Sequence, residues 1–443
     1  MIASNRGQGR SVPAEWVRTI SSVIFGEHSR MNDQYIPRES EAFVRRIVHS
    51  FPSVALTGMR QAGKSTLLRH TFPDFTYVTF DDPLRQQEAL EDPALFLQKC
   101  PEPVILDEIQ YVPEITRFIK LKIDQQRNVY GRFILTGSQQ FTLIKHLGDS
   151  LAGRIGLLEL YPFSIHEKLR IPHCAESLKT PLEAYVDACL RGSFPELSTM
   201  PDTDPWIWYG SYLRTYIERD VRGLYGIGSI REFQCFMQLL ATRCSRQLNM
   251  SSLANDVGVA TNTIKNWISI LESSRIIFLL PPWTANVGKR VVKSPKVYFA
   301  DCGLVCYLSG IRDRHYVLEG SQAGALFENF VIQEIVKTAA FHGNSPSLYY
   351  LRTRDGLEID LIIEDSPRRV IPVEIKLSQT PKSAMAAPME RCRAEFPSLK
   401  LADGHIVCLT PESRSPARGA IAEDIRRFLD WYEKQRRISP EVK

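Results

Sequence analysis

Between residues 35 and 165 the hydrophobic pattern switches repeatedly between the period of a strand and the period of a helix. Short apolar runs predict strands at 53–57, 77–80, 104–106 and 132–136. Helical spacing of apolar residues predicts helices at 39–49, directly after residue 63 and at 115–127. Strands that alternate with helices of this length form a mainly parallel sheet with helices on both faces. The pattern therefore predicts an α/β domain in this part of the chain.

The pattern changes twice after this domain. Residues 180–274 have mostly helical spacing, whereas strand-like runs and helices mix beyond residue 296. The first thirty residues have no strong pattern, and a more natural beginning lies near Met31. We therefore expect an N-terminal extension at 1–34, the α/β domain at 35–165, a helical and winged-helix region at 166–295, and a small α+β domain with a C-terminal helix at 296–443.

Composition agrees with a folded, multidomain protein. A chain of 443 residues that is 44% hydrophobic and 24% charged is too apolar for a disordered protein. The net charge of +5 is spread over the chain, so it permits a nucleic-acid partner without requiring one. The nine cysteines include no Cys-x-x-Cys pair, which argues against a zinc finger or a disulfide framework. No apolar run is long enough to cross a bilayer, and the first ten residues lack an apolar signal core, so we expect a cytoplasmic protein without a membrane partner.

Residues 58–65 carry the strongest chemical signal in the sequence. They match the pattern Gly-x-x-x-x-Gly-Lys-Ser/Thr and lie between a predicted strand and a predicted helix. Glycines let backbone N–H groups close around phosphate oxygens, Lys64 neutralises the β and γ phosphates, and the Ser65 hydroxyl is a magnesium ligand. We therefore predict a P-loop NTPase sheet that binds ATP and Mg²⁺, rather than an ordinary glycine-rich turn. The predicted nucleotide-binding residues are Gly58, Met59, Arg60, Gln61, Ala62, Gly63, Lys64, Ser65, Thr66 and Asp107.

A second predicted strand, Val104-Ile105-Leu106, ends in two carboxylates. Acidic residues at the carboxyl end of a sheet strand lie where ligands bind in α/β folds. Asp107 suits magnesium, and Glu108 suits the base that orients the attacking water. A helix N-cap after a strand is the alternative interpretation. The phosphate loop favours the catalytic one.

Further catalytic candidates follow the next strand. Thr136 and Ser138 both offer a hydroxyl that would sense the γ phosphate or hold the lytic water, and Ser138 is the predicted catalytic residue. Arg154 has the chemistry of an arginine finger, which stabilises transition-state charge, but a surface salt bridge accounts for it nearly as well.

Residues 251–268 have the pattern of a helix-turn-helix. Apolar residues on two short helices would face one another across a turn at Gly258, and a strand-like segment and a basic stretch follow at 275–293, as in a winged helix. Interdomain packing explains such a unit as well as DNA contact does. In a DNA complex the contacting residues would be Asn262, Lys265, Asn266, Lys289, Arg290 and Lys293.

A third constellation lies near the C-terminus. Asp360 is in an alternating strand, and Glu374 and Lys376 share one face of the strand after the next turn. Two carboxylates can hold Mg²⁺ while a lysine positions or activates water for phosphodiester cleavage. This set resembles the restriction-endonuclease-like nuclease motif, and Glu328 matches the acidic residue of the first helix of that fold. The resemblance implies Glu328, Asp360 and Glu374 as ligands of a nuclease Mg²⁺, with Lys376 as the catalytic lysine. A cross-strand ion pair on a solvent-exposed sheet would give the same sequence pattern.

These residues together carry a resemblance to a known group of proteins. Residues from Tyr35 to about Phe163 look like the ATPase domain of prokaryotic AAA-type proteins, and the later half is similar to the region that accompanies it. The resemblance covers almost everything after Met31. It implies ATPase activity and a homo-oligomer in which Arg154 acts on a neighbour's nucleotide.

Three functions are compatible with these features. The leading hypothesis is a Mg²⁺-dependent ATPase whose nucleotide state changes how the C-terminal modules engage a partner, with nucleic acid preferred. The second is a nucleotide-gated regulator that acts through protein contacts. The third is a Mg²⁺-dependent DNA nuclease for which ATP is regulatory.

Overall fold

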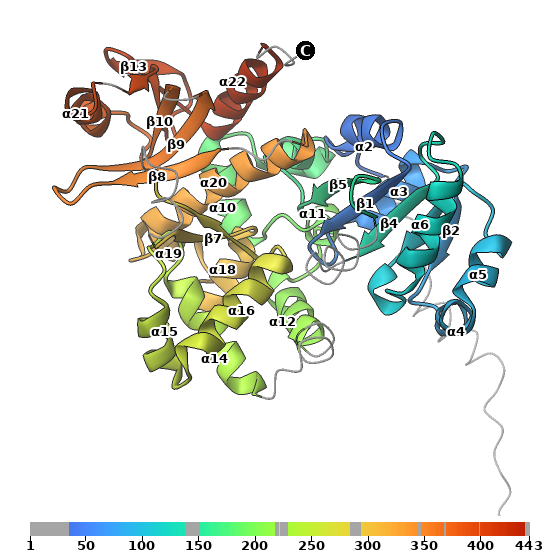
Figure 1. Cartoon of the computed structure of the whole chain (residues 1–443). Helices are drawn as coiled ribbons and strands as arrows, with labels where there is room; N and C mark the ends of the chain where they lie inside the picture. Colours follow the sequence, from blue (N-terminus) through green and yellow to red (C-terminus); the bar gives the residue numbers. More distant parts are fainter. Residues whose placement is uncertain are drawn as a thin grey trace, which may run out of the picture. The chain divides into compact units, whose positions relative to one another are not determined.

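The first sheet of the chain has five parallel strands. The computed structural model describes residues 35–137, 151–217, 221, 229–283, 294–343, 347–366, 369–397 and 399–438 (Figure 1). The strands of this sheet are β1 (Ser53–Gly58), β2 (Thr76–Thr79), β3 (Val104–Asp107), β4 (Phe133–Gly137) and β5 (Ile155–Leu160). Their order across the sheet is β2-β3-β4-β1-β5, with every pair parallel. The predicted parallel sheet is confirmed, and the carboxyl ends of β1, β3 and β4 meet at one edge.

Helices connect these strands, as the pattern predicted. They are α2 (Glu41–Val48), α3 (Lys64–Thr71), α4 (Pro83–Glu91), α5 (Pro93–Lys99) and α6 (Ile115–Gln125), with the short 3₁₀ turn η2 (Ile109–Tyr111) after β3. The starts of α4 and α5 follow from the sequence, because each has a proline at its first position. Asp82 and Asp92 cap them by accepting hydrogen bonds from Leu84 N and Leu95 N.

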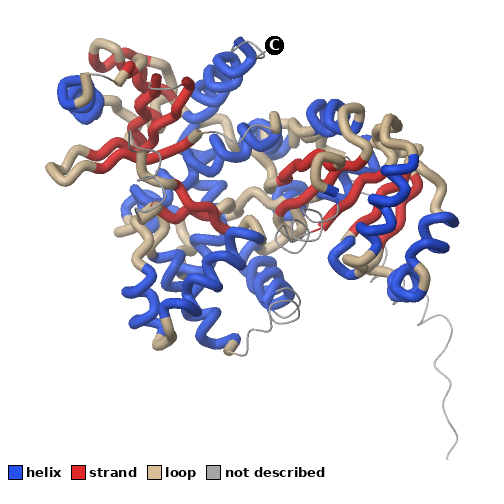
Figure 2. Tube along the Cα trace, viewed as in Figure 1, coloured by secondary structure: helices blue, strands red, loops and turns tan. Residues whose placement is uncertain are grey.

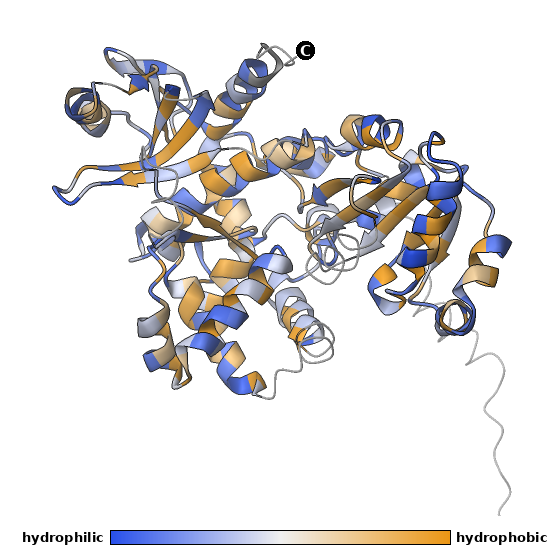
Figure 3. Ribbon diagram, viewed as in Figure 1, coloured by the Kyte–Doolittle hydropathy of each residue, from blue (hydrophilic) through white to orange (hydrophobic). Residues whose placement is uncertain are grey.

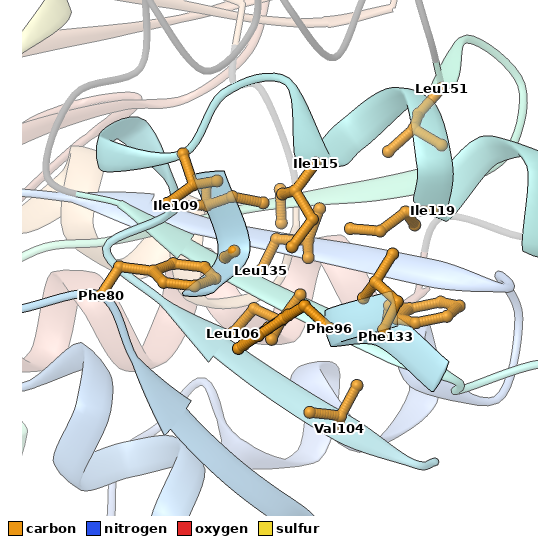
Figure 4. Packing of buried hydrophobic residues seen from close by; sticks show 14 of the residues in the cluster. Phe80, Phe96, Val104, Leu106, Ile109, Ile115, Ile119, Phe133, Leu135 and Leu151 are labelled. Atoms are coloured by element: carbon orange, nitrogen blue, oxygen red, sulfur yellow. The ribbon is translucent and has the colours of Figure 1, made fainter. Parts of the chain in front are cut away.

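Buried apolar side chains hold the sheet against its helices. Every residue of β1, β3 and β4 is buried, as expected for the interior strands of a parallel sheet. Figure 3 shows these strands as largely hydrophobic ribbons. In Figure 4, Ile115 and Ile119 of α6 pack with Phe133 and Leu135 of β4 in one cluster. Burying one such side chain contributes roughly 1.5–3 kcal/mol, so this cluster fixes the strand ends that carry the polar site residues.

A helical region follows the sheet (Figure 2). Its first helices are α8 (Ile165–Lys168), α9 (Pro172–Ser177), α10 (Pro181–Leu190), α11 (Pro195–Thr199) and α12 (Pro205–Tyr216). Next come α14 (Ile230–Thr242), α15 (Met250–Val257) and α16 (Thr261–Ser273). Trp267 of α16 contacts the rings of Phe233 and Phe236 of α14, and Gly258, at φ 82°, ends α15 in the left-handed conformation. The helix-turn-helix pattern of the sequence thus corresponds to two packed helices.

A two-stranded antiparallel sheet comes after α16. Its strands are β6 (Ile277–Leu280) and β7 (Lys296–Phe299), with Ile277 opposite Phe299. The domain boundary expected at residue 295 therefore falls between two paired strands. The described residues from Pro37 onward form one compact unit.

The C-terminal part contains a second, mixed sheet. It is preceded by α18 (Cys302–Ser309), α19 (Arg314–Glu319) and α20 (Ala323–Phe341), and its seven strands are β8 (Leu348–Arg352), β9 (Glu358–Ser366), β10 (Arg369–Ile375), β11 (Lys400–Leu401), β12 (Gly404–Val407), β13 (Arg414–Ala417) and β14 (Ala420–Glu423). The 3₁₀ turn η4 (Ser383–Ala386) and the helices α21 (Ala387–Glu395) and α22 (Ile425–Ile438) complete it. The fold class predicted from the sequence, a parallel sheet followed by a helical region and a small α+β part, is confirmed.

Helix α20 is 19 residues long and mostly buried, including several polar side chains. The Asn329 amide is one example, because it accepts from Phe299 N at 2.8 Å and donates to Phe299 O at 3.1 Å. A buried amide paired in this way stabilises the contact of α20 with β7. Among the described residues no helix combines the length and the apolar composition needed to cross a membrane.

Candidate functional site

The phosphate loop connects β1 to α3. A Cβ atom at Gly58, which has φ 146°, would lie 2.0 Å from the backbone oxygen of Leu160 in β5. Gly63 has φ 90° and precedes α3, and Gln61 also has a positive φ, of 60°. Glycine is required at residue 58 by this close approach and favoured at residue 63 by its conformation. The loop ends at the N-terminus of α3, and a helix N-terminus is a place where anions bind.

Lys64 is buried at the start of α3. Its Nζ atom donates to the backbone oxygens of Gly58 at 3.2 Å and Met59 at 3.0 Å, so the ammonium lies over the loop. Met59 and Ala62 are fully buried and take part in the loop through their backbone alone. A buried lysine at the start of the helix that follows this loop fits the binding of a phosphate chain.

Three hydroxyl groups surround Asp107 at the end of β3. Ser65 Oγ donates to Asp107 Oδ2 at 2.7 Å, Tyr77 donates to the same oxygen, and Thr136 donates to Oδ1. Burial and the hydrogen bond to Asp107 raise the pKa of Tyr77, so the phenol remains a donor. The buried Asp107 carboxylate and the Ser65 hydroxyl form a donor set of the type that holds Mg²⁺ beside a nucleotide.

Glu108 follows in the left-handed conformation, at φ 58° and ψ 45°. A non-glycine residue in this region costs on the order of 1 kcal/mol or more, and such residues gather at active sites. Its backbone N–H donates to Thr136 Oγ1 at 3.2 Å, and Gln110 donates to its carboxylate. Thr136 thus connects both acids, whereas Ser138, the residue predicted for this role, lies outside the described residues.

Arg154 is not brought to the phosphate loop. It immediately precedes β5, and its backbone oxygen accepts from Ser53 N at the start of β1, whereas the loop follows the end of that strand. Its guanidinium pairs with Asp124, at 2.7 Å from Nε to Oδ1. Parallel register thus places Arg154 at the edge of the sheet opposite the phosphate loop of its own chain, and the predicted finger that acts on a neighbour's nucleotide stays a prediction. A finger role requires a neighbouring copy of the chain.

Arg38 forms hydrogen bonds that hold the phosphate loop in place. Its guanidinium donates to Ala62 O in the loop at 2.8 Å, to Tyr161 O at 2.7 Å and to Glu167 Oε1 at 2.9 Å. Both Arg38 and Glu167 are buried, so the pair is protected from solvent. The guanidinium thereby fixes the loop relative to the segment after β5.

A carboxylate cluster forms in the C-terminal sheet. Lys376 Nζ lies 2.8 Å from Asp360 Oδ2 and 2.7 Å from Glu374 Oε2, and Ile375 N donates to Asp360 Oδ2 at 2.8 Å. Glu328 of α20 is held at 3.0 Å from its Oε1 to Lys296 Nζ. The structure thus brings the predicted carboxylates of α20, β9 and β10 together with Lys376.

The cluster is buried enough to shift its own titration. Burial and, second, the Asp360 charge raise the pKa of Glu374 to about 8. Burial likewise raises the pKa of Glu328 to about 7. Glu374 Oε1 is buried and has no hydrogen-bond partner among the described residues. An oxygen in this position is costly unless it binds a ligand, and Asp360 and Glu374 supply the hard oxygen donors that Mg²⁺ or Mn²⁺ prefers.

The helix-turn-helix presents part of its predicted contact set. Asn262, Lys265 and Asn266 are exposed on α16, on the side away from the buried Trp267. The other candidates, Lys289, Arg290 and Lys293, lie outside the described residues.

The chain matches three known domain families. Residues 50–169 match the AAA domain, residues 182–315 match a domain of unknown function, DUF8612, and residues 323–423 match another, DUF4143. Two proteins, "Uncharacterized protein Rv2008c" of Mycobacterium tuberculosis and "Uncharacterized protein Mb2031c" of Mycobacterium bovis, are each 32% identical over 347 residues, which is 78% of this chain and 74% of the relative. The chain belongs to the family of these two proteins. Its AAA domain supports ATP binding and hydrolysis.

Two solved structures resemble this chain at low TM-scores. The Walker-type ATPase PABY2304 of Pyrococcus abyssi has a TM-score of 0.43 and 16% identity, and covers 63% of this chain and 97% of its own. The RuvB Holliday junction branch migration motor of Thermotoga maritima has a TM-score of 0.31 and 16% identity, and covers 57% and 92%. At these TM-scores neither similarity bears on the function of this family member.

Sequence reasoning missed four residues of the two sites. Arg38 has no local signal, because its partners are far away in sequence. Tyr77 lies in the short strand β2, and the alternation of side chains along a strand puts Tyr77 and Thr79 on the same face. These two polar residues indicated that one face of the strand is polar. Lys296 and Tyr298 share a face of β7 in the same way, and this polar pair in an apolar strand was a readable signal.

Glu39 belongs to an ionic network near Arg38. Glu39, His166 and Glu433 each place one potential ligand atom within 4.8 Å of the others. The Glu39 carboxylate already accepts from Ser164 Oγ at 3.1 Å and lies 3.7 Å from the Arg170 guanidinium. This group therefore has the contacts of a charge network. Burial and, second, the Glu167 charge raise the pKa of Glu39 to about 7.

This shift predicts how stability depends on pH. Because the folded chain keeps the Glu39 proton that the unfolded chain loses above its usual pKa of 4.5, stability falls as pH rises from about 5 to 7. Glu39→Gln removes this loss, so its free energy of unfolding relative to the unchanged protein should rise between pH 5 and pH 8, by up to about 3 kcal/mol. Urea unfolding at both pH values measures the difference. Glu176→Gln, at an exposed carboxylate, is the control, and an equal offset for Glu39→Gln at both pH values would contradict the assignment.

Proposed function

We propose that this protein is a Mg²⁺-dependent ATPase that couples hydrolysis to the engagement of nucleic acid by its C-terminal part. The observation that carries the ATPase proposal is the hydrogen bond from Ser65 to Asp107 beside a buried Lys64. Ser65 and Asp107 would hold Mg²⁺, which neutralises phosphate charge when bound. Lys64 would contact the β and γ phosphates, and Glu108 would orient the attacking water and accept its proton.

Contacts of α20 support coupling between the two parts. Glu334 Oε2 accepts from Ile165 N at 2.7 Å, and Lys337 Nζ donates to Phe163 O at 3.0 Å and to Glu334 Oε1 at 2.8 Å. These partners lie in the segment after β5 that Arg38 joins to the phosphate loop. The same helix carries Glu328 of the carboxylate cluster. A movement of the phosphate loop on nucleotide binding can thus reach that cluster through a short series of buried contacts. These contacts couple the two sites when nucleotide and the ligand of the cluster both shift the same conformational equilibrium.

Nucleic acid is the proposed partner because α16, the second helix of the helix-turn-helix, exposes one basic and two amide side chains. ATP turnover by the full-length protein should rise when duplex DNA is added, and the rise should disappear at high salt because phosphate contacts release counterions. Lys265→Glu should weaken the rise, with Lys99→Glu as the matched surface control. Equal turnover with and without DNA would favour the alternative, a nucleotide-gated regulator that acts through protein contacts. Turnover that persists in excess chelator would contradict the Mg²⁺ requirement.

A second activity, Mg²⁺-dependent phosphodiester cleavage, is favoured by one specific observation. Glu374 Oε1 is buried and without a partner among the residues that the structure describes, next to Asp360 and Lys376. Asp360 and Glu374 would hold the ion, and Lys376 would position the attacking water and stabilise charge on the phosphate. The ammonium is available for this role, because the attraction of Asp360 and Glu374 exceeds the effect of burial and raises the pKa of Lys376.

A further inference from the structure

A second lysine, Lys296, also contacts the carboxylate cluster. It is the first residue of β7, and its side chain is only 5% exposed. Its Nζ atom lies 3.0 Å from Glu328 Oε1 and 3.1 Å from Glu358 Oε1. Burying an ammonium group costs several kcal/mol unless it is paired, so these two contacts fix its position.

The two lysines divide the carboxylates between them. Lys376 bridges Asp360 and Glu374, whereas Lys296 bridges Glu328 and Glu358. The Glu328 Oε1 atom also accepts from the Tyr298 hydroxyl at 2.5 Å, so that oxygen has two donors. In contrast, Glu374 Oε1 has no partner in the described part of the chain. The open coordination position of the cluster therefore lies on the Glu374 side.

Charge balance leads to the same division. The four carboxylates and two ammonium groups named above, together with the Arg352 guanidinium 3.9 Å from Glu358, leave one negative charge when all are ionised. One divalent ion nearly balances this charge, whereas a second would leave a large excess of positive charge in a mostly buried cluster, which is unfavourable. Burial alone would lower the pKa of Lys296, but the attraction of Glu328, Asp360 and Glu358 raises it, so the ammonium stays charged.

We infer that Lys296 takes the place of a second metal ion, withholding Glu328 from coordination so that the cluster binds one divalent ion through Asp360 and Glu374. This inference rests on the proposed metal-binding role of the cluster. It makes Lys296 a positioning residue that sets the metal stoichiometry and not a metal ligand. A purely structural ion pair would stabilise the fold without influencing how many ions bind.

The test counts Mn²⁺ ions bound to the nucleotide-free, full-length protein by electron paramagnetic resonance. The unchanged protein should bind one ion and Lys296→Met two, because removal of the ammonium frees Glu328 and Glu358. Lys296→Arg keeps the charge and should bind one. The double variant Lys296→Met with Glu328→Gln should return to one ion, which assigns the added site to Glu328. Circular dichroism checks that each variant is folded.

The possible outcomes distinguish the role of Lys296 from the proposed metal-binding role of the cluster. One ion in both the unchanged protein and folded Lys296→Met, or two in the unchanged protein, would overturn the role of Lys296 and leave the metal site standing. No bound ion in the unchanged protein would remove both. If Lys296→Met does not fold, the single variant Glu328→Gln tests the inference. A residue that is withheld from the metal ion should change the Mn²⁺ affinity less than about tenfold when it is replaced, because tenfold is the smallest loss typical of groups that support a metal site. A larger loss would show that Glu328 coordinates the ion.

Discussion

ATP turnover by Lys64→Ala should be at least about a hundredfold below that of the unchanged protein, which is the scale of removing one group that stabilises developing charge. The ammonium is buried over the loop and donates to Gly58 O and Met59 O, so the substitution removes a fixed positive charge from the loop. Lys99→Ala, at an exposed lysine of α5, is the matched control and should keep full turnover. A phosphate-release assay measures both.

Glu108→Gln separates binding from chemistry in the same site. The amide keeps the size of the side chain and its contact with Gln110, but it is no base. Nucleotide should therefore bind with nearly unchanged affinity while turnover falls by about two orders of magnitude or more. Normal turnover in both Lys64→Ala and Glu108→Gln would refute the assigned roles.

Loss of metal binding and of plasmid cleavage is the expected result of Asp360→Asn. Asp360 Oδ2 is contacted by Lys376 Nζ and Ile375 N, each at 2.8 Å, so the substitution removes the charge from a carboxylate with a fixed orientation. Mn²⁺ affinity should fall by at least about tenfold to a hundredfold, a range that changes beside a metal site already produce. Asp355→Asn, at an exposed position before β9, is the control.

ATP binding and hydrolysis distinguish a local effect of Asp360→Asn from misfolding. The folded variant should keep both, since the phosphate loop belongs to the other sheet. Cleavage that persists unchanged in Asp360→Asn, with metal still bound, would remove the cluster as its source. Metal binding without any cleavage in the unchanged protein would leave a binding site and retire the nuclease proposal.

The sequence predicted those parts of the fold that are determined by residues close together in the sequence. Strands β1, β3 and β4 are buried apolar runs, and the residues that follow them are polar, so motif and period alone placed Lys64 and Asp107 correctly at one edge. Asp360 and Lys376 were brought together by the same reasoning, because a hairpin pairs adjacent strands. Their roles remain predictions.

Residues whose position depends on distant pairing could not be placed from sequence. Arg154 required the register of β5 against β1, which pattern analysis does not supply. Arg38 reaches Glu167 across 129 positions of the chain. Lys296 was assigned to the start of a new domain, whereas β7 pairs backward with β6. In each case tertiary packing, and not local propensity, decides the surroundings of the side chain.

The pair Glu334 and Lys337 also bears on how this family evolved. Both side chains are almost completely buried, and they satisfy Ile165 N and Phe163 O, which lie within the stretch that matches the AAA domain. A fragment that stops at residue 169 would leave those backbone groups unsatisfied and expose the surface that α20 covers. We expect such a fragment to aggregate. Recombination that exchanges one half for an unrelated one should be selected against, so the halves should descend together as a single inherited unit.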